Sequence, residues 1–135
     1  MPTVPDSDLQ RNETPGAARL NTRAIGASAE DYAADYLTSA GYEILERNFR
    51  LRMGEIDCIA RDRDGTLVFV EVKSARYGSC GHPFSWVTPR KQRTLAKVAR
   101  AYLARLGPNA GPCRFDVLAV LRHKIDHLRN AFLVG

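Results

Sequence analysis

Residues 54–73 read GEIDCIARDRDGTLVFVEVK, and this stretch decides the fold of the chain. Its two ends, residues 54–60 and 67–73, are apolar and rich in β-branched side chains, as β-strands are. Asp64-Gly65 between them is a turn signal. The stretch therefore predicts two antiparallel strands joined by a short loop.

The length of that loop decides which side chains face each other. With a two-residue loop, Asp57 would lie opposite Val72, and Glu71 would point to the other face of the sheet. With a three-residue loop that ends on a left-handed Gly65, Asp57 instead lies opposite Glu71. We predict the three-residue loop. Like charges placed directly opposite each other destabilise a sheet, and a hard divalent cation with oxygen ligands removes that repulsion, so this register predicts a metal site.

The composition describes one globular domain with a modest preference for polyanionic partners. The 135 residues carry a formal net charge of +5 and a pI of about 9.4, which favours nucleic acid. Three scattered cysteines imply neither a disulfide framework nor a zinc site and fit a reducing compartment. No stretch resembles a membrane span or a signal peptide, so we expect a cytoplasmic protein without a membrane partner.

The remaining elements are arranged around the hairpin. Residues 1–23 are polar and proline-containing, which predicts a disordered tail before a domain at 24–135. The second of two predicted helices has the clearer boundaries, with Thr88 as its N-cap, Pro89 in its first turn and Gly107 at its end. The other expected elements are a helix at 25–40 and strands at 42–50, 114–121 and 124–132.

Polar side chains fall on the inward-facing sides of both helices. Glu30 lies about 20° from Leu37 around the first helix, so its carboxylate points toward the core side. An acid near a helix N-terminus is also favoured by the helix dipole, and that explanation is the better one for Glu30 alone. Together with the carboxylates of Asp57 and Glu71, however, the interpretation of Glu30 as a metal ligand is strengthened. Lys91 and Gln92 extend the apolar stripe of the second helix back to its N-terminus, where a phosphate is favoured.

Several other polar positions have structural interpretations. Asp116 is expected to pair with Arg114 or the sheet edge rather than to touch the site. His127 has no partner at a metal-ligand spacing and is interpreted as a surface residue. Strict alternation places Cys58 on the face of Ile56, as a small core residue.

The element order αβββαββ, with Asp57 on the second strand and Glu71-x-Lys73 on the third, resembles the PD-(D/E)xK nuclease superfamily. Residues 24–132 more closely resemble the YraN family of predicted endonucleases, relatives in fold of archaeal Holliday-junction resolvases. The segments that carry the resemblance are NFRLRMGEIDCIA, LVFVEVK, VTPRKQRTL and RFDVLAV, in that order. The resemblance implies an α/β protein with a restriction-endonuclease-like mixed sheet flanked by helices. Members often carry an arginine two positions after the lysine, where this chain has Ala75, followed by Arg76.

The resemblance also implies a role for each site residue. Mg²⁺ or Mn²⁺ would be bound by Glu30, Asp57, Glu71 and the carbonyl of Val72. Lys73 would orient or deprotonate the attacking water, and Glu55, opposite it in the predicted register, would hold its ammonium in place. The helix would complete the site with Gln92 and grip a phosphate with Lys91, and further nucleic-acid contacts would come from Arg90, Arg93 and Arg76.

The predicted function is a metal-dependent endonuclease acting on DNA. The chain has no base-reading helix motif, so branched or structured DNA is expected rather than a defined sequence, and the resemblance allows a homodimer. One alternative is a nucleic-acid-binding or assembly module that keeps the fold and does not cut. Another is a protein-interaction scaffold that uses Phe84-Ser85-Trp86, a segment that could equally be a dimer contact, a stacking platform or a plug over the core.

Overall fold

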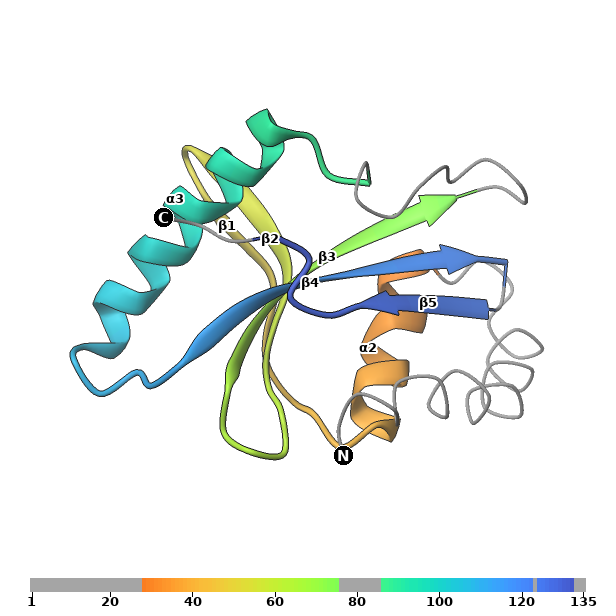
Figure 1. Cartoon of the computed structure of the whole chain (residues 1–135), viewed down its shortest axis with the longest axis horizontal. Coiled ribbons are helices and arrows are strands. Elements are labelled where there is room, and N and C mark those ends of the chain that lie inside the picture. Colours follow the sequence, from red (N-terminus) through yellow and green to blue (C-terminus); the bar gives the residue numbers. More distant parts are fainter. Residues whose placement is uncertain (1–27, 76–85, 123, 133–135) are drawn as a thin grey trace.

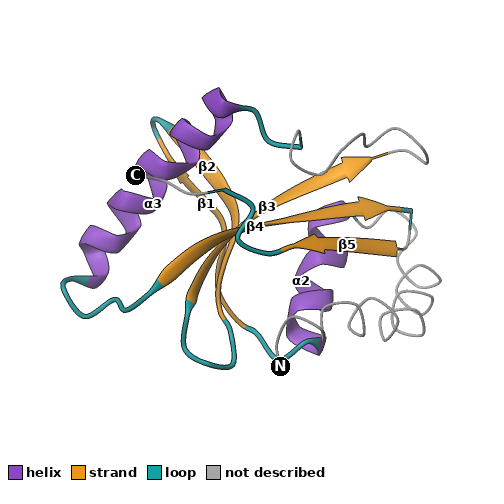
Figure 2. Ribbon diagram, in the orientation of Figure 1, coloured by secondary structure: helices purple, strands orange, loops and turns teal. Residues whose placement is uncertain are grey.

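The structure is a computed structural model that describes residues 28–75, 86–122 and 124–132. Two helices pack against a five-stranded sheet (Figures 1 and 2). The elements follow in the order α2 Ala29–Ser39, β1 Glu43–Leu51, β2 Gly54–Arg61, β3 Leu67–Ala75, α3 Pro89–Leu106, β4 Cys113–Leu121 and β5 Lys124–Leu128. The predicted αβββαββ order in a mixed α/β sheet is confirmed. The predicted tail, Arg76, Phe84 and Ser85 lie outside the described residues.

The sheet is mixed because one pair of neighbours runs parallel. The strands lie side by side in the order β1-β2-β3-β4-β5, and β3 and β4 are the parallel pair. Parallel neighbours need a crossover connection, and α3 lies on that connection, on one face of the sheet (Figure 1). Among the described helices, none is long and apolar enough to cross a membrane.

The central hairpin has the three-residue loop that the sequence predicted. The Asp62 N–H donates to the Thr66 carbonyl over 3.0 Å, and Gly65 has a φ of 92°. The register pairs Arg61 with Leu67 and continues to the pair of Cys58 with Val70. Only a left-handed residue closes this loop without strain, which is why glycine stands at position 65. One step beyond the last pair, the register places Asp57 opposite Glu71.

Local signals also set the helix boundaries. In α2, Ser28 and Asp31 form a capping box, and Gly41, just past the helix, has a φ of 95°. In α3, the Thr88 hydroxyl accepts a hydrogen bond from the Lys91 N–H over 3.1 Å. Pro89 occupies the first turn of α3, which ends at Gly107 as predicted.

The two helices cover opposite faces of the sheet, because neighbouring strand residues alternate between them. The α3-side cluster contains helix residues such as Val98 and Tyr102. The α2-side cluster contains Tyr36 and Leu37. From β3, the first cluster takes Leu67 and Phe69, and the second takes Val68 and Val70.

One strand changes face within the sheet. Ile56 belongs to the α3-side cluster and Cys58 to the α2-side cluster, so the prediction that they share a face is wrong. The reason lies on the neighbouring strand, where Asn48 has a left-handed φ of 55°. The ladder pairs Arg47 with Cys58 and Phe49 with Ile56, which leaves Asn48 and Asp57 opposite each other between those pairs. A bulge-like distortion of this kind re-aims side chains, and here it changes the face of the strand at Asp57.

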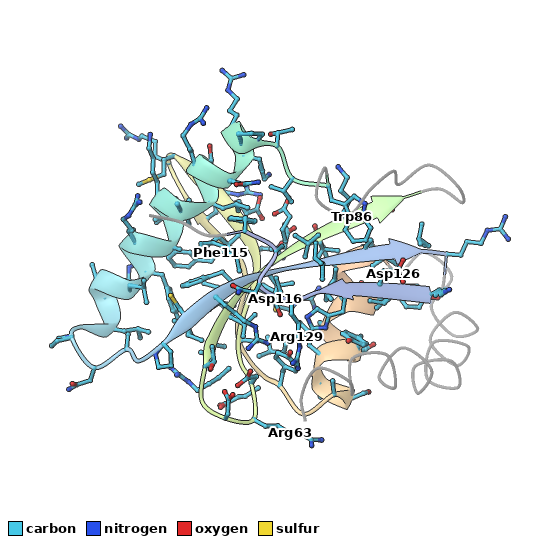
Figure 3. The ribbon with its side chains drawn as sticks, viewed as in Figure 1. Arg63, Trp86, Phe115, Asp116, Asp126 and Arg129 are labelled. Atoms are coloured by element: carbon cyan, nitrogen blue, oxygen red, sulfur yellow. The ribbon has the colours of Figure 1, made fainter. Side chains whose placement is uncertain are left out.

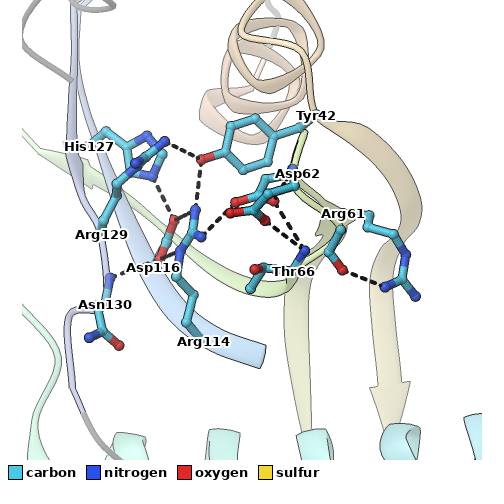
Figure 4. A network of polar contacts seen from close by, with 11 residues as sticks. Tyr42, Arg61, Asp62, Thr66, Arg114, Asp116, His127, Arg129 and Asn130 are labelled. Carbon is cyan, nitrogen blue, oxygen red and sulfur yellow. Dashed lines mark hydrogen bonds and ion pairs between the residues drawn. The ribbon is translucent and has the colours of Figure 1, made fainter. Parts of the chain in front are cut away.

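A polar network closes the end of the sheet where the central hairpin turns (Figure 4). Arg114 forms ion pairs with Asp62 over 2.7 Å and with Asp116 over 2.9 Å. It also donates a hydrogen bond to the Tyr42 hydroxyl over 2.9 Å. The predicted pairing of Asp116 with Arg114 is therefore confirmed.

His127 belongs to the same network and is not a surface residue, as the sequence had suggested. It is 9% exposed, with Nε2 2.8 Å from Asp116 and Nδ1 2.8 Å from the Tyr36 hydroxyl. Burial acts to raise the pKa of Asp116, but the hydrogen bonds and charges of His127 and Arg114 outweigh it, so the pKa is lowered. The network ties together α2, Tyr42 just before β1, the hairpin loop, β4 and β5.

Candidate functional site

The candidate site lies where β2 and β3 part. Pairing between these strands ends at Cys58 and Val70, while β3 continues alongside β4 as far as Ala75. At the parting, the Val72 N–H donates to Asp57 Oδ2 over 2.8 Å. A side-chain carboxylate thus takes the hydrogen bond that a strand carbonyl would otherwise accept, which fixes Asp57 beside the backbone of β3.

Asp57 and Glu71 meet on the α3 side of the sheet, as the predicted register requires. Burial and then the charge of Asp57 raise the pKa of Glu71 to about 7, and the Lys91 charge opposes this. Burial also raises the pKa of Asp57, against the Val72 hydrogen bond and a hydrogen bond with Glu71. The environment therefore disfavours ionisation of both carboxyl groups, because two neighbouring carboxylates repel each other in a partly buried place.

A cation from α3 already faces this pair. Lys91 Nζ lies 3.4 Å from Glu71 Oε2, and the Glu71 side chain is only 15% exposed. The other carboxylate oxygen, Oε1, is buried and has no hydrogen-bond partner among the described residues. An unsatisfied buried oxygen is unusual, and it leaves this carboxylate with an acceptor that no described residue uses.

The other predicted site residues lie around this pair. Gln92 Nε2 donates to the Val87 carbonyl over 2.9 Å, so its amide is bound to the segment that enters α3. Lys73 is exposed and shares the strand face of Glu71 by alternation. Arg90 and Arg93 are exposed on α3.

Two predicted contacts are corrected by the structure. Glu55 pairs with Arg50 of β1 over 3.1 Å rather than with Lys73, because β2 and β3 have already separated at that level. Glu30 does not join the two carboxylates. It lies on α2, which packs on the other face of the sheet, and its charge acts on Arg47. Within the three described segments, no three His, Cys, Asp or Glu side chains form a group that could hold a metal ion.

The loop before α3 contributes to the core. Trp86, labelled in Figure 3, is 6% exposed and belongs to the α3-side cluster together with Val87. Of the roles considered for this segment, the plug over the core is the one that Trp86 fulfils.

Asn48 was missed by sequence reasoning although it shapes the site. It lies opposite Asp57 and carries the left-handed backbone that changes the face of the strand. The available signal was an asparagine inside a strand pattern, since asparagine adopts this conformation more readily than most residues.

The fold and the site together define an α/β protein with a pair of carboxylates where the two strands of its central hairpin separate. The chain belongs to the UPF0102 family: residues 29–120 match the family described as "Uncharacterised protein family UPF0102". This confirms the YraN-like resemblance. The UPF0102 protein of Symbiobacterium thermophilum is 54% identical over 99 residues, which cover 73% of this chain and 83% of the relative. That of Pelobacter propionicus is 45% identical over 129 residues, covering 90% and 92%.

Two solved structures resemble part of this chain at 16% sequence identity. One is a complex of EndoMS with double-stranded DNA, with a TM-score of 0.39, and the other is a repair endonuclease from Pyrococcus abyssi, with a TM-score of 0.37. The similarity covers 69% and 70% of this chain but only 36% and 39% of those longer chains.

Proposed function

We propose that this chain is a Mg²⁺- or Mn²⁺-dependent phosphodiesterase that cleaves DNA, with branched or otherwise structured DNA as its substrate. The observation that carries the proposal is the meeting of Asp57 and Glu71 where β2 and β3 part, with Lys91 3.4 Å from Glu71. Lys73 follows two residues later on the same strand. A pair of partly buried carboxylates that repel each other is unfavourable for the fold alone, so its chemistry points to a bound cation.

The donor set fits a hard divalent cation. Asp57, Glu71 and the Val72 carbonyl would hold the ion through oxygen, and the buried Glu71 Oε1 offers an acceptor that no described residue uses. Magnesium usually takes only one or two protein carboxylates and leaves its other positions to water and phosphate oxygens. Bound here, such an ion supplies charge neutralisation at the phosphate and lowers the pKa of a water molecule.

Lys73 is the residue that we assign to the attacking water. Lys73 is exposed and leaves the sheet on the same face as Glu71, two residues further along β3. From there it can orient the water and stabilise the negative charge that develops on the pentacovalent phosphate.

The first turns of α3 would hold the DNA backbone. Lys91 neutralises Glu71 in the metal-free protein, and with a cation bound there its ammonium is available to a phosphate. Gln92 would act as a positioning residue, because its bond to the Val87 carbonyl fixes the start of the helix. Exposed Arg90 and Arg93 add backbone contacts that carry no sequence information.

The decisive variant is Asp57→Asn, which removes the charge and keeps an oxygen for the Val72 N–H. We expect cleavage of fluorescent branched, flapped and linear DNAs in Mn²⁺ to fall by at least about a hundredfold. The thermal stabilisation by Mn²⁺ should also disappear, because the ion loses a ligand. Asp35→Asn is the matched control, since exposed Asp35 lies on α2, which covers the other face of the sheet, and it should cut like the native protein. Equal cleavage by Asp57→Asn and the native protein would refute the assignment.

The same experiment identifies the second candidate, a nucleic-acid-binding or assembly module that does not cut. Exposed Arg90, Arg93 and Lys97 of α3 need no metal ion to contact phosphates, so they can hold DNA when no cleavage occurs. DNA binding together with an absence of both cleavage and Mn²⁺-induced stabilisation in the native protein would select this module.

A further inference from the structure

The geometry points to the tip of the β1–β2 hairpin, with Met53 at its end, as a wedge that contacts unstacked bases beside the cleaved phosphate. This inference rests on the proposed function and deepens it, because it names the feature of the DNA that the protein selects: a base step that is already open, as at a branch point or fork. The partner of this surface is DNA, which an apolar side chain flanked by cations would recognise.

Met53 is the more exposed of two large hydrophobic side chains that lie on the described surface. It is 50% exposed, and the other, Leu106 at the end of α3, is 40% exposed. Met53 follows exposed Arg52, and the Arg50 side chain beside them is 73% exposed. Proteins that open base steps insert an apolar side chain such as methionine and hold the backbone with neighbouring cations.

The tip is held in place against α3. A Cβ atom built on Gly54 would lie 2.5 Å from the Thr94 methyl group, so the hairpin end rests directly on the helix with no room for a side chain. Figure 2 shows β1 and β2 turning beside α3. Thr94 is flanked by Arg93 and, one turn on, by Lys97, both exposed. The apolar tip and the helix cations therefore form one surface that is suited to DNA.

The tip is also close to the carboxylate pair along the same strand. Only three residue steps of β2 separate Gly54 from Asp57, a distance of about 10 Å at the usual rise of a strand. Met53 is one residue further, at about 13 Å from Asp57. Each nucleotide of duplex DNA rises about 3.4 Å, so a phosphate at the carboxylates places Met53 within about four base steps. Opening a step is easiest where bases are mismatched or unpaired, so the wedge favours forks and branches over continuous duplex.

The test compares native protein with Met53→Ala, Met53→Leu and Leu106→Ala in EDTA, where binding is measured without cleavage. The probes are a forked DNA with 2-aminopurine at the branch point and a linear duplex of equal length. We expect Met53→Ala to lose about tenfold in affinity for the fork, to change little on the duplex, and to lose the rise in 2-aminopurine fluorescence that reports unstacking. Met53→Leu and Leu106→Ala should behave like the native protein.

Each alternative result has a defined meaning. The wedge is overturned if Met53→Ala keeps the fork affinity and the fluorescence rise, if it weakens fork and duplex equally, or if Leu106→Ala has the same effect. Asp57-dependent cleavage with no role for Met53 rejects the wedge alone. Met53-dependent unstacking without any cleavage keeps the wedge and rejects the phosphodiesterase. If the native protein binds neither DNA, both are rejected.

Discussion

Glu71 lies in surroundings that disfavour its ionised form. Burial and Asp57 raise its pKa from the ordinary 4.5 to about 7, and one of its oxygens is buried without a described partner. The folded protein therefore binds the Glu71 proton more tightly than the unfolded chain does. The contribution of this proton to the free energy of unfolding is fully present below about pH 4.5 and is lost as the pH rises through about 7. At about 1.36 kcal/mol per pKa unit, the ionised group reduces stability by about 3 kcal/mol.

Replacing this residue should therefore stabilise the protein at alkaline pH. In EDTA we expect Glu71→Gln to unfold at higher urea concentration than the native protein at about pH 8.5, by up to ~3 kcal/mol, and to match it at about pH 5. The exposed Glu43→Gln on β1 is the control and should show no such dependence on pH. A Glu71→Gln protein that is less stable at both pH values would mean that the carboxylate has a structural role instead.

The β1–β2 hairpin positions the site through its contact with α3. Gly54 leaves no room for a Cβ atom, because the methyl group of Thr94 lies 2.5 Å from that position. Thr94 is β-branched and cannot rotate away freely, so a larger residue at position 54 must push the strand off the helix. The strand that would move also carries Asp57.

We therefore expect Gly54→Ala to reduce the free energy of unfolding by about 1–3 kcal/mol, the usual effect of overpacking. Urea denaturation of Gly54→Ala, Thr94→Ala and the double variant measures this as a double-mutant cycle. Removing the Thr94 methyl should restore most of the loss, with a coupling of at least ~0.5 kcal/mol. Additive effects of the two substitutions would show that the contact is not the cause.

The parts of the fold that could be predicted are those with local causes. Asp64-Gly65 allowed the three-residue loop, because a glycine at its last position meets the need for a left-handed backbone. Thr88, Pro89 and Gly107 predicted the ends of α3, since each satisfies or terminates helix hydrogen bonds by itself.

What the sequence could not supply depends on contacts between distant segments. Glu55 pairs with Arg50 and not with the predicted Lys73, because β2 and β3 separate beyond Cys58. The pattern of a single strand does not reveal such a separation. His127 is buried because Asp116 and Tyr36 occupy both of its ring nitrogens, and Tyr36 lies 91 residues away in the chain. The face of Glu30 likewise depends on which side of the sheet its helix covers.

At the scale of the whole molecule, the two ends of the sheet have opposite characters. At the hairpin-loop end, Arg114 lies between Asp62 and Asp116 and is within 2.9 Å of both carboxylates. At the other end, Lys91 lies 3.4 Å from Glu71, and its charge also acts on Asp57. The acids of the first end are compensated by a cation of the chain itself, whereas the second pair is where we propose that a metal ion binds.

The distribution of charge predicts how that binding depends on salt. α3 contains six basic residues and no acidic one, and its exposed Arg93 and Lys97 lie one turn apart. If each contacts a phosphate, Arg93→Gln and Lys97→Gln should each reduce the slope of log affinity against log salt by about 1, with similar losses on all DNA sequences. Arg63→Gln, in the hairpin loop at the bottom of Figure 3, removes the same charge far from α3 and should leave the slope unchanged. If all three variants keep the slope of the native protein, the DNA binds on another face of the molecule. The slope reflects only those cations that contact phosphates and release counterions.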